Sequence, residues 1–162
     1  MATRKKAASK AKTAPDAIAL LKEDHAKVSA MFKQYDKLGD KANATKLDLA
    51  RKICKELKVH TQIEEEIFYP ATRAALPKEG DLLDEAQVEH DGAKDLIRQL
   101  DAMKPEDDLF DAKVTVLGEY IKHHVKEEHE EMFPKVRKTD LDLRALGMRM
   151  AARKRVLAKR KR

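Results

Sequence analysis

Two short segments of the sequence carry a histidine and a glutamate four positions apart. His60 is followed by Glu64, His124 is followed by Glu128, and a proline stands six residues after each glutamate. Residues four apart lie on the same face of an α-helix, about 6 Å apart along its axis. An imidazole and a carboxylate placed in this way can bind one metal ion or two neighbouring ions. The pattern therefore predicts a metal site carried by helices.

Two further histidines precede these segments at nearly equal distances. His25 stands 35 residues before His60, and His90 stands 34 residues before His124. Each of these leading histidines follows an acidic residue and begins an apolar helical stripe, so the sequence is two helical hairpins of one design. If every inward stripe faces one core, four imidazoles and two carboxylates converge there. The predicted metal ligands are His25, His60, Glu64, His90, His124 and Glu128.

The types of these side chains restrict the metal. Imidazole and carboxylate suit iron, manganese or zinc, and without converging cysteines an iron–sulfur cluster is not expected. Two buried, unpaired carboxylates would cost several kcal/mol each, and a pair of cations removes that cost. We expect each ion to take two histidines from one hairpin, with both glutamates bridging. Open positions then remain for an oxo or hydroxo bridge and a small molecule.

A second histidine–glutamate pair lies one residue earlier on the last of these segments. His123 and Glu127 have the same spacing as His124 and Glu128, so the local pattern alone leaves both pairs open. The gapless alignment of the two segments favours His124 and Glu128. In that alignment His129 falls opposite a glutamate, and we interpret it as a solvated residue.

Other side chains near the pattern have simpler interpretations. Asp24 and Glu89 are predicted to be surface acids, although a position beside a ligand histidine is an alternative. Glu65 and Glu127 are predicted either to be exposed or to contact a ligand. The remaining predictions are a buried structural thiol for Cys54 and core positions for Tyr35, Tyr69 and Tyr120, the last within reach of His124.

The spacing of apolar residues predicts the elements that position this site. Apolar residues recur every three or four positions, which is the period of an amphipathic helix. Proline and glycine mark the boundaries, and Pro70 and Pro134 are expected to end their helices. The fold class predicted is all-α, an up-down-up-down four-helix bundle with short connections. The expected helices span about 16–39, 44–69, 81–104 and 106–134, with a fifth, basic helix from about 140.

The charges divide the chain into an acidic body and two basic ends. Residues 1–15 carry five basic groups and residues 144–162 carry nine, with no acid in either segment, although the net charge is only +6. We predict a disordered basic arm over 1–13, the bundle over 14–138 and a basic helix or tail over 139–162.

The basic ends have three alternative partners. They could bind nucleic acid nonspecifically through phosphates, or dock on the acidic body of the protein. They could also bind an anionic membrane surface, because Leu146, Met150 and Leu157 fall near one side of the last helix. No aromatic interleaving or known motif indicates recognition of a specific sequence.

Several classes of protein are not indicated. No apolar stretch approaches the length needed to span a membrane, and no apolar segment near the start would act as a secretory signal. The single cysteine cannot form an internal disulfide, which favours a cytoplasmic location. No residue pattern indicates a nucleophile triad, a phosphate-binding loop or a pair of glycosidase carboxylates.

Taken together, the acid–His pairs and the His-x3-Glu segments before Pro resemble the hemerythrin-like HHE cation-binding domains over about residues 16–138. The resemblance implies a non-haem di-iron centre in a four-helix bundle, held by the six predicted ligands. Members of the family bind or react with oxygen, hydrogen peroxide or nitric oxide, or act as sensors of iron and oxygen.

At one position this sequence differs from the oxygen carriers of this family. They have a fifth histidine four residues after the first histidine of the third helix, where this chain has Lys94. The centre is therefore expected to be more symmetric, which favours reactivity or sensing over reversible oxygen transport. The alternatives are a non-enzymatic sensor or metal store and, less favoured, an architectural protein of the nucleoid.

Overall fold

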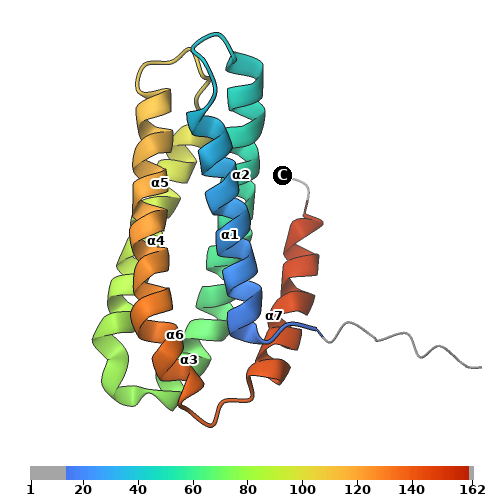
Figure 1. Cartoon of the computed structure of the whole chain (residues 1–162), viewed down its shortest axis with the longest axis vertical. Helices are drawn as coiled ribbons and strands as arrows, with labels where there is room; N and C mark the ends of the chain where they lie inside the picture. Colours follow the sequence, from blue (N-terminus) through green and yellow to red (C-terminus); the bar gives the residue numbers. More distant parts are fainter. Residues whose placement is uncertain (1–13, 161–162) are drawn as a thin grey trace, which may run out of the picture.

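The computed structural model describes residues 14–160, and every regular element in that range is a helix. Four long helices form an antiparallel bundle: α1 (Ala17–Asp36), α2 (Asn43–Ile63), α4 (Gly80–Asp101) and α5 (Phe110–Glu127) (Figure 1). The four-helix architecture agrees with the fold predicted from apolar spacing. The arm predicted over residues 1–13 lies outside the described residues.

The chain enters α1 through a capped first turn. Oδ1 of Asp16 accepts a hydrogen bond from the backbone N–H of Ala19 at 2.8 Å, which satisfies one of the unpaired amides at the helix start. The buried positions of α1 then recur along one stripe that includes Leu21, His25 and Val28. This stripe turns the first predicted ligand inward.

The helices that carry the two glutamates continue past their prolines. α2 runs into a π-helical segment, η1 (Glu64–Phe68), and then into α3 (Tyr69–Ala75). α5 likewise runs into η3 (Glu128–Met132) and α6 (Phe133–Arg137). A short 3₁₀ turn, η2 (Pro77–Glu79), joins α3 to α4. The expectation that Pro70 and Pro134 end their helices was therefore wrong.

The wider π turns explain why both prolines are tolerated. A proline lacks an N–H donor, and in an α-helix its ring clashes with the carbonyl four residues earlier. Here the amide of Tyr69, just before Pro70, bonds to the carbonyl of Glu64, five residues back. The amide of Phe133 bonds to the carbonyl of Glu128 in the same way. The extra residue in each turn changes which carbonyl faces the proline, so the helix continues.

Two apolar clusters fill the bundle, one on each side of a polar layer. Phe68, Phe133 and Leu21 belong to the cluster at the end formed by α3 and α6. Leu57 and Leu117 belong to the cluster toward the opposite end. The predicted ligands lie between these clusters along each helix, so the metal-binding candidates are enclosed by packed side chains above and below.

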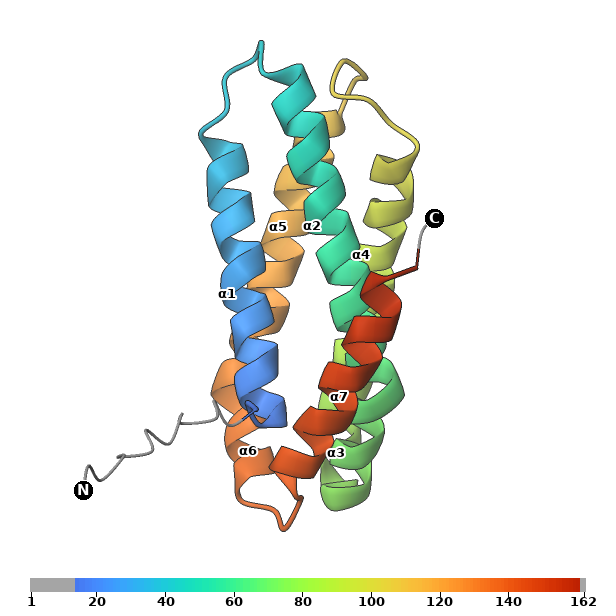
Figure 2. The ribbon, with the colours of Figure 1, turned by 90° about the vertical axis from the view of Figure 1, so that its right-hand side faces the viewer.

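A fifth helix, α7 (Leu143–Ala158), lies along α1 and α2 on the outside of the bundle (Figure 2). The side chain of Asp142 caps its start by accepting a hydrogen bond from the amide of Ala145 at 3.0 Å. Three of its apolar residues, Leu146, Met150 and Leu157, are buried against the bundle. The alternative in which these three side chains face a membrane was therefore wrong.

α7 approaches α1 very closely at one glycine. A β-carbon placed on Gly147 would lie 2.7 Å from both the backbone nitrogen of Ala17 and the carbonyl oxygen of Pro15. Only glycine leaves room for this contact between the two backbones. Among residues 14–160, no helix is both long and apolar enough to cross a membrane.

Candidate metal centre

All six predicted ligands converge in the middle of the bundle. α1 contributes His25, α2 His60, α4 His90 and α5 His124, and the two π segments each begin with a glutamate, Glu64 in η1 and Glu128 in η3. Each of the six is 7% exposed or less. A π segment inside an α-helix often marks a functional site, and here each one begins at a carboxylate of the cluster.

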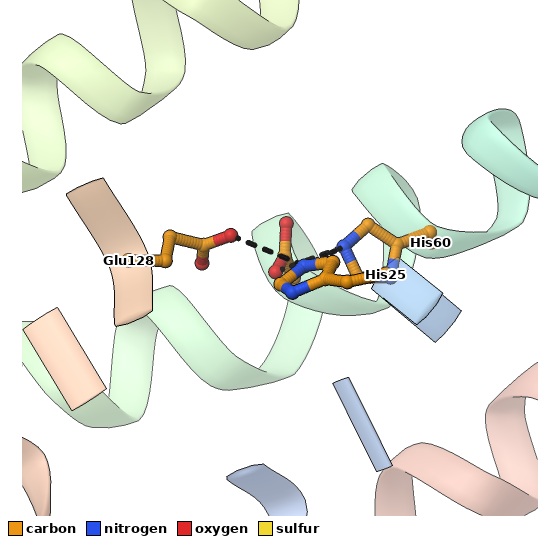
Figure 3. A group of neighbouring side chains, drawn as sticks. His25, His60 and Glu128 are labelled. Atoms are coloured by element: carbon orange, nitrogen blue, oxygen red, sulfur yellow. Dashed lines mark hydrogen bonds and ion pairs between the residues drawn. The ribbon is translucent and has the colours of Figure 1, made fainter. Parts of the chain in front are cut away.

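The ligand atoms form two adjacent groups, each built around the histidine pair of one hairpin. In the first group, Nε2 of His25 lies 3.0 Å from Nε2 of His60 and 3.4 Å from Oε1 of Glu128 (Figure 3). In the second, the Nε2 atoms of His90 and His124 lie 3.1 Å apart. Each histidine pair thus comes from one hairpin, as the sequence predicted.

The two glutamates lie between these histidine pairs. Oε1 of Glu64 is 3.1 Å from Nε2 of His60, and its Oε2 is 3.0 Å from Nε2 of His90. Oε1 of Glu128 is 3.1 Å from Nε2 of His124 and also faces the first group. Both carboxylates are therefore placed to bridge two positions.

Two acidic residues hold the outward nitrogen of one histidine in each hairpin. Nδ1 of His60 donates to Oδ2 of Asp24 at 3.1 Å, and Nδ1 of His124 donates to Oε2 of Glu89 at 2.6 Å. Asp24 is buried and Glu89 is half-buried. The prediction that both are surface acids was wrong, and the alternative position beside a ligand histidine is the one observed.

The other two histidines have outer partners that occupy equivalent positions in the repeat. Nδ1 of His90 donates to Oε1 of Glu65 at 2.9 Å, and Nδ1 of His25 lies 2.8 Å from Nε2 of His129. The interpretation of His129 as a solvated residue was therefore wrong. The alignment already paired position 129 with Glu65, so a partner for each leading histidine could have been found there.

These outer hydrogen bonds determine which nitrogen faces the centre. With Nδ1–H donating outward, the Nε2 lone pair of each histidine points at its neighbours. Oε1 of Glu64 and Oε1 of Glu128 are buried without a hydrogen-bond donor among the described residues. The centre thus brings together many electron pairs, which is an environment that a bound cation would complete.

The pKa values of these groups respond to the same arrangement. Burial disfavours the charged form of His60, but the Glu64 carboxylate and the bond to Asp24 outweigh it and raise its pKa to about 10. The pKa of Glu64 is held well below its usual value, against burial, by His60 and the other surrounding imidazoles. In the absence of a metal, protons on the imidazoles therefore supply the positive charge.

Tyr69 is the residue of the centre whose role sequence reasoning missed. It is buried, as predicted for a core residue, but its hydroxyl reaches into the cluster. Oη lies 3.2 Å from Oε2 of Glu64 and 3.2 Å from the Nε2 atoms of both His90 and His124. Burial and the two nearby carboxylates raise the pKa of this phenol well above its usual value.

The alternative histidine–glutamate pair lies on the outside. His123 is an exposed residue whose Nε2 pairs with Oε1 of Glu127 at 3.0 Å, and the two form a separate group with Glu89. Tyr120 is also exposed, so its predicted core position was wrong. Tyr35 and Cys54 are buried, in agreement with their predicted core positions.

A groove of about 550 Å³ reaches the cluster between α1 and α5. Its walls include Ser29 and Phe32 of α1 and Gly118 and Val125 of α5, and it ends at His25.

The second histidine pair is covered by an ion pair instead of lying beside the groove. Nζ of Lys94 lies 2.6 Å from both carboxylate oxygens of Glu65, so the residue at the fifth-histidine position pairs with an acid instead of facing the cluster.

Comparison with known proteins gives the family. The family model described as hemerythrin HHE cation binding domain matches residues 16–136, which includes all six clustered residues.

The chain belongs to the hemerythrin HHE cation-binding domain family.

A solved structure of a hemerythrin HHE cation binding domain-containing protein from Mycobacterium kansasii has the same fold. Its TM-score is 0.74 at 25% identity, with 89% of this chain and 88% of that chain covered.

A relative at the sequence level is a protein named DNA nickase from Nostoc sp. (strain PCC 7120). It is 29% identical over 118 residues, which are 73% of this chain but only 32% of the relative. This HHE chain thus spans about a third of that protein's length. The match adds to the evidence for a shared domain, while the activity in the relative's name belongs to the longer protein.

Proposed function

We propose that this HHE domain holds two non-haem iron ions and that the centre binds or reacts with oxygen, hydrogen peroxide or nitric oxide. The observation that supports this most is the orientation of four imidazoles. Each has its Nδ1 held by an outer partner and its Nε2 turned toward the two buried carboxylates. Manganese or zinc would fit the same donor set, and iron is favoured by the family.

The proposed ligands divide between two positions. His25 and His60 would hold one ion, His90 and His124 the other, and Glu64 with Glu128 would bridge them. Bound iron would supply one-electron redox chemistry and open coordination positions for a small ligand. The protein's part is to keep each imidazole in the correct tautomer, through residues such as Asp24, and to exclude bulk water with the apolar clusters on either side.

Metal analysis together with an absorption spectrum of aerobically purified protein tests this proposal. We expect two metal ions per chain in the wild type and loss of both in a His60→Ala, His124→Ala double variant. His123→Ala is the matched control, because that imidazole is exposed on the same helix turn and should leave the metal content unchanged. Two ions retained by the double variant would overturn the assignment. Reactivity is then measured by adding peroxide to the iron-loaded protein and following its consumption.

A second candidate function is a non-enzymatic sensor that acts through α7. The ammonium of Lys154 on α7 pairs with Oδ1 of Asp24, whose other oxygen accepts the bond from His60. This chain of contacts joins the basic helix to the first histidine pair. The helix and the residues just after it also present exposed cations, which suit phosphate backbones: Arg144, Arg149, Arg155, Lys159 and Arg160.

DNA mobility shifts at low salt, with metal-loaded and metal-free protein, test the sensor. A difference in affinity between the two forms supports it, and equal binding without metal would favour an architectural role instead. No shift in either form would remove nucleic acid as a partner.

A cytoplasmic location stays a prediction from the lone cysteine.

A further inference from the structure

The two halves of the centre differ at the position of the repeat that precedes each proline. Tyr69 and Phe133 both stand directly before the proline that follows a π segment. Each ring packs beside a leading histidine. The Tyr69 ring lies 5.3 Å from that of His90, and the Phe133 ring stacks on that of His25 at 6.0 Å. These two side chains differ by one hydroxyl, which is present beside His90 and absent beside His25.

The Tyr69 hydroxyl completes a tetrahedral arrangement of donor atoms. In the second group, Oε2 of Glu64 lies 3.0 Å from Nε2 of His90 and 3.9 Å from Nε2 of His124, and the two nitrogens are 3.1 Å apart. Oη of Tyr69 lies 3.2 Å from each of these three atoms.

The four atoms therefore form a tetrahedron with five edges of 3.0–3.2 Å and one longer edge of 3.9 Å. Edges of this length place the centre about 2 Å from every corner, which is the usual length of a metal–nitrogen or metal–oxygen bond.

We propose that Tyr69 is the additional ligand of the second metal position, which it binds through its phenolate oxygen. This inference rests on the proposed metal centre. When a metal binds, the O–H bond of the phenol breaks, the oxygen–metal bond forms, and the proton leaves to bulk water.

The consequence is an asymmetric centre in place of the symmetric one expected from the absence of a fifth histidine. The second position is filled by Tyr69, and the ion pair between Lys94 and Glu65 covers its outer side. The first position has Phe133, which offers no donor atom, and the groove between α1 and α5 ends at its ligand His25. The open position, where a small molecule is bound, is therefore the one held by His25 and His60.

The experiment is a comparison of Tyr69→Phe with wild-type protein, both reconstituted with ferric iron. A phenolate bound to ferric iron gives a charge-transfer band in the visible region and phenolate modes in the resonance Raman spectrum. We expect both signals in the wild type and their loss in Tyr69→Phe, with about tenfold or greater weakening of one of the two metal affinities. A near-ultraviolet difference spectrum on metal addition reports phenol ionisation independently of which metal is bound.

Two matched controls make the result specific. Tyr35→Phe removes another buried tyrosine hydroxyl, one that donates to Asp111 far from the cluster, and should keep every signal. Phe133→Tyr adds the hydroxyl in the first half and should add phenolate signal rather than remove it.

Two metal ions with no phenolate signal, or with a signal unchanged in Tyr69→Phe, would overturn the role of Tyr69 and leave the metal centre standing. Failure of the wild type to bind metal would overturn the metal centre itself and this inference with it.

Discussion

Oδ2 of Asp24 lies 3.1 Å from Nδ1 of His60, and both side chains are almost completely buried. A buried carboxylate in this position orients the imidazole ring and strengthens it as a donor to a metal. The pair joins adjacent helices, so the orientation of His60 depends on how α1 packs against α2.

Asp24→Asn is therefore expected to weaken metal binding by about 10–100-fold, since an amide orients the ring but lacks the charge. Competition with a coloured chelator measures the change. Asp48→Asn is the matched control, because Asp48 is an exposed acid on α2 that pairs only with Lys52 among the ion pairs of the described residues. An unchanged affinity in Asp24→Asn would show that the hydrogen bond does not support the site.

Lys154→Met should also weaken metal binding, but by less than Asp24→Asn. Lys154 acts only through Asp24, where its charge helps hold the carboxyl pKa below its usual value against the effect of burial. Calorimetric titration with metal gives the affinity. Lys159→Met removes an exposed charge just after the end of α7 and should have no effect. If both lysine variants behave alike, the link between α7 and His60 carries no energy.

The metal-free protein should lose stability as the pH rises. Because the folded-state pKa of His60 is raised from 6.5 to about 10, its stabilising contribution is complete below 6.5 and disappears as the pH passes about 10. Thermal unfolding measured at intervals from pH 6 to 10 tests this. The metal-loaded protein should show a smaller decline, since the ion replaces the proton. A melting temperature of the metal-free form that is constant over this range would contradict the prediction.

Gly147→Val should destabilise the docking of α7 by about 1–3 kcal/mol, which is the usual cost of overpacking. A β-carbon there would be only 2.7 Å from backbone atoms, which cannot move away as a side chain can. Urea unfolding gives the free energy, and limited proteolysis shows whether α7 is the part released. Gly39→Ala is the control, because no heavy atom lies within 4 Å of a β-carbon at that position.

Ser29→Trp should slow the arrival of small ligands without changing the metal content. Ser29 is exposed and lines the groove one helical turn from His25, so a large ring there narrows the path. The association rate of azide with the iron-loaded protein, followed by absorption, is the measurement. Ser29→Ala should retain the wild-type rate. Equal rates in the two variants would mean that ligands reach the centre by another path.

The repeat allowed the sequence to predict the convergence of His124 and Glu128 rather than the neighbouring pair. Periodicity assigns a face of a helix, and the comparison of the two halves removed the remaining choice. How deeply a side chain is buried is harder to infer from periodicity, and for that reason Asp24 and His129 were expected in solvent. Each borders the ligand stripe, and whether such a residue is covered depends on a neighbouring helix.

The role of Tyr69 could not be predicted for a different reason. Counting in steps of 3.6 residues from Glu64 gives the wrong direction for a side chain that follows a π turn. The continuation of the helix past Pro70 was missed for the same reason. A proline ends a helix only if the preceding turn has α geometry, and here that turn bonds five residues back.

The extra residue in each π segment also shifts the angular positions of all later side chains around the helix axis. One inserted residue rotates the later side chains by about 100° around the helix axis. The residues beyond Glu64 and Glu128 therefore follow a new angular register, one that turns Phe68 and Phe133 into the core at the end of the bundle. Deleting a single residue within η1 would restore an unbroken α-helix, yet it would swing the Tyr69 hydroxyl out of the centre while leaving His60 in place.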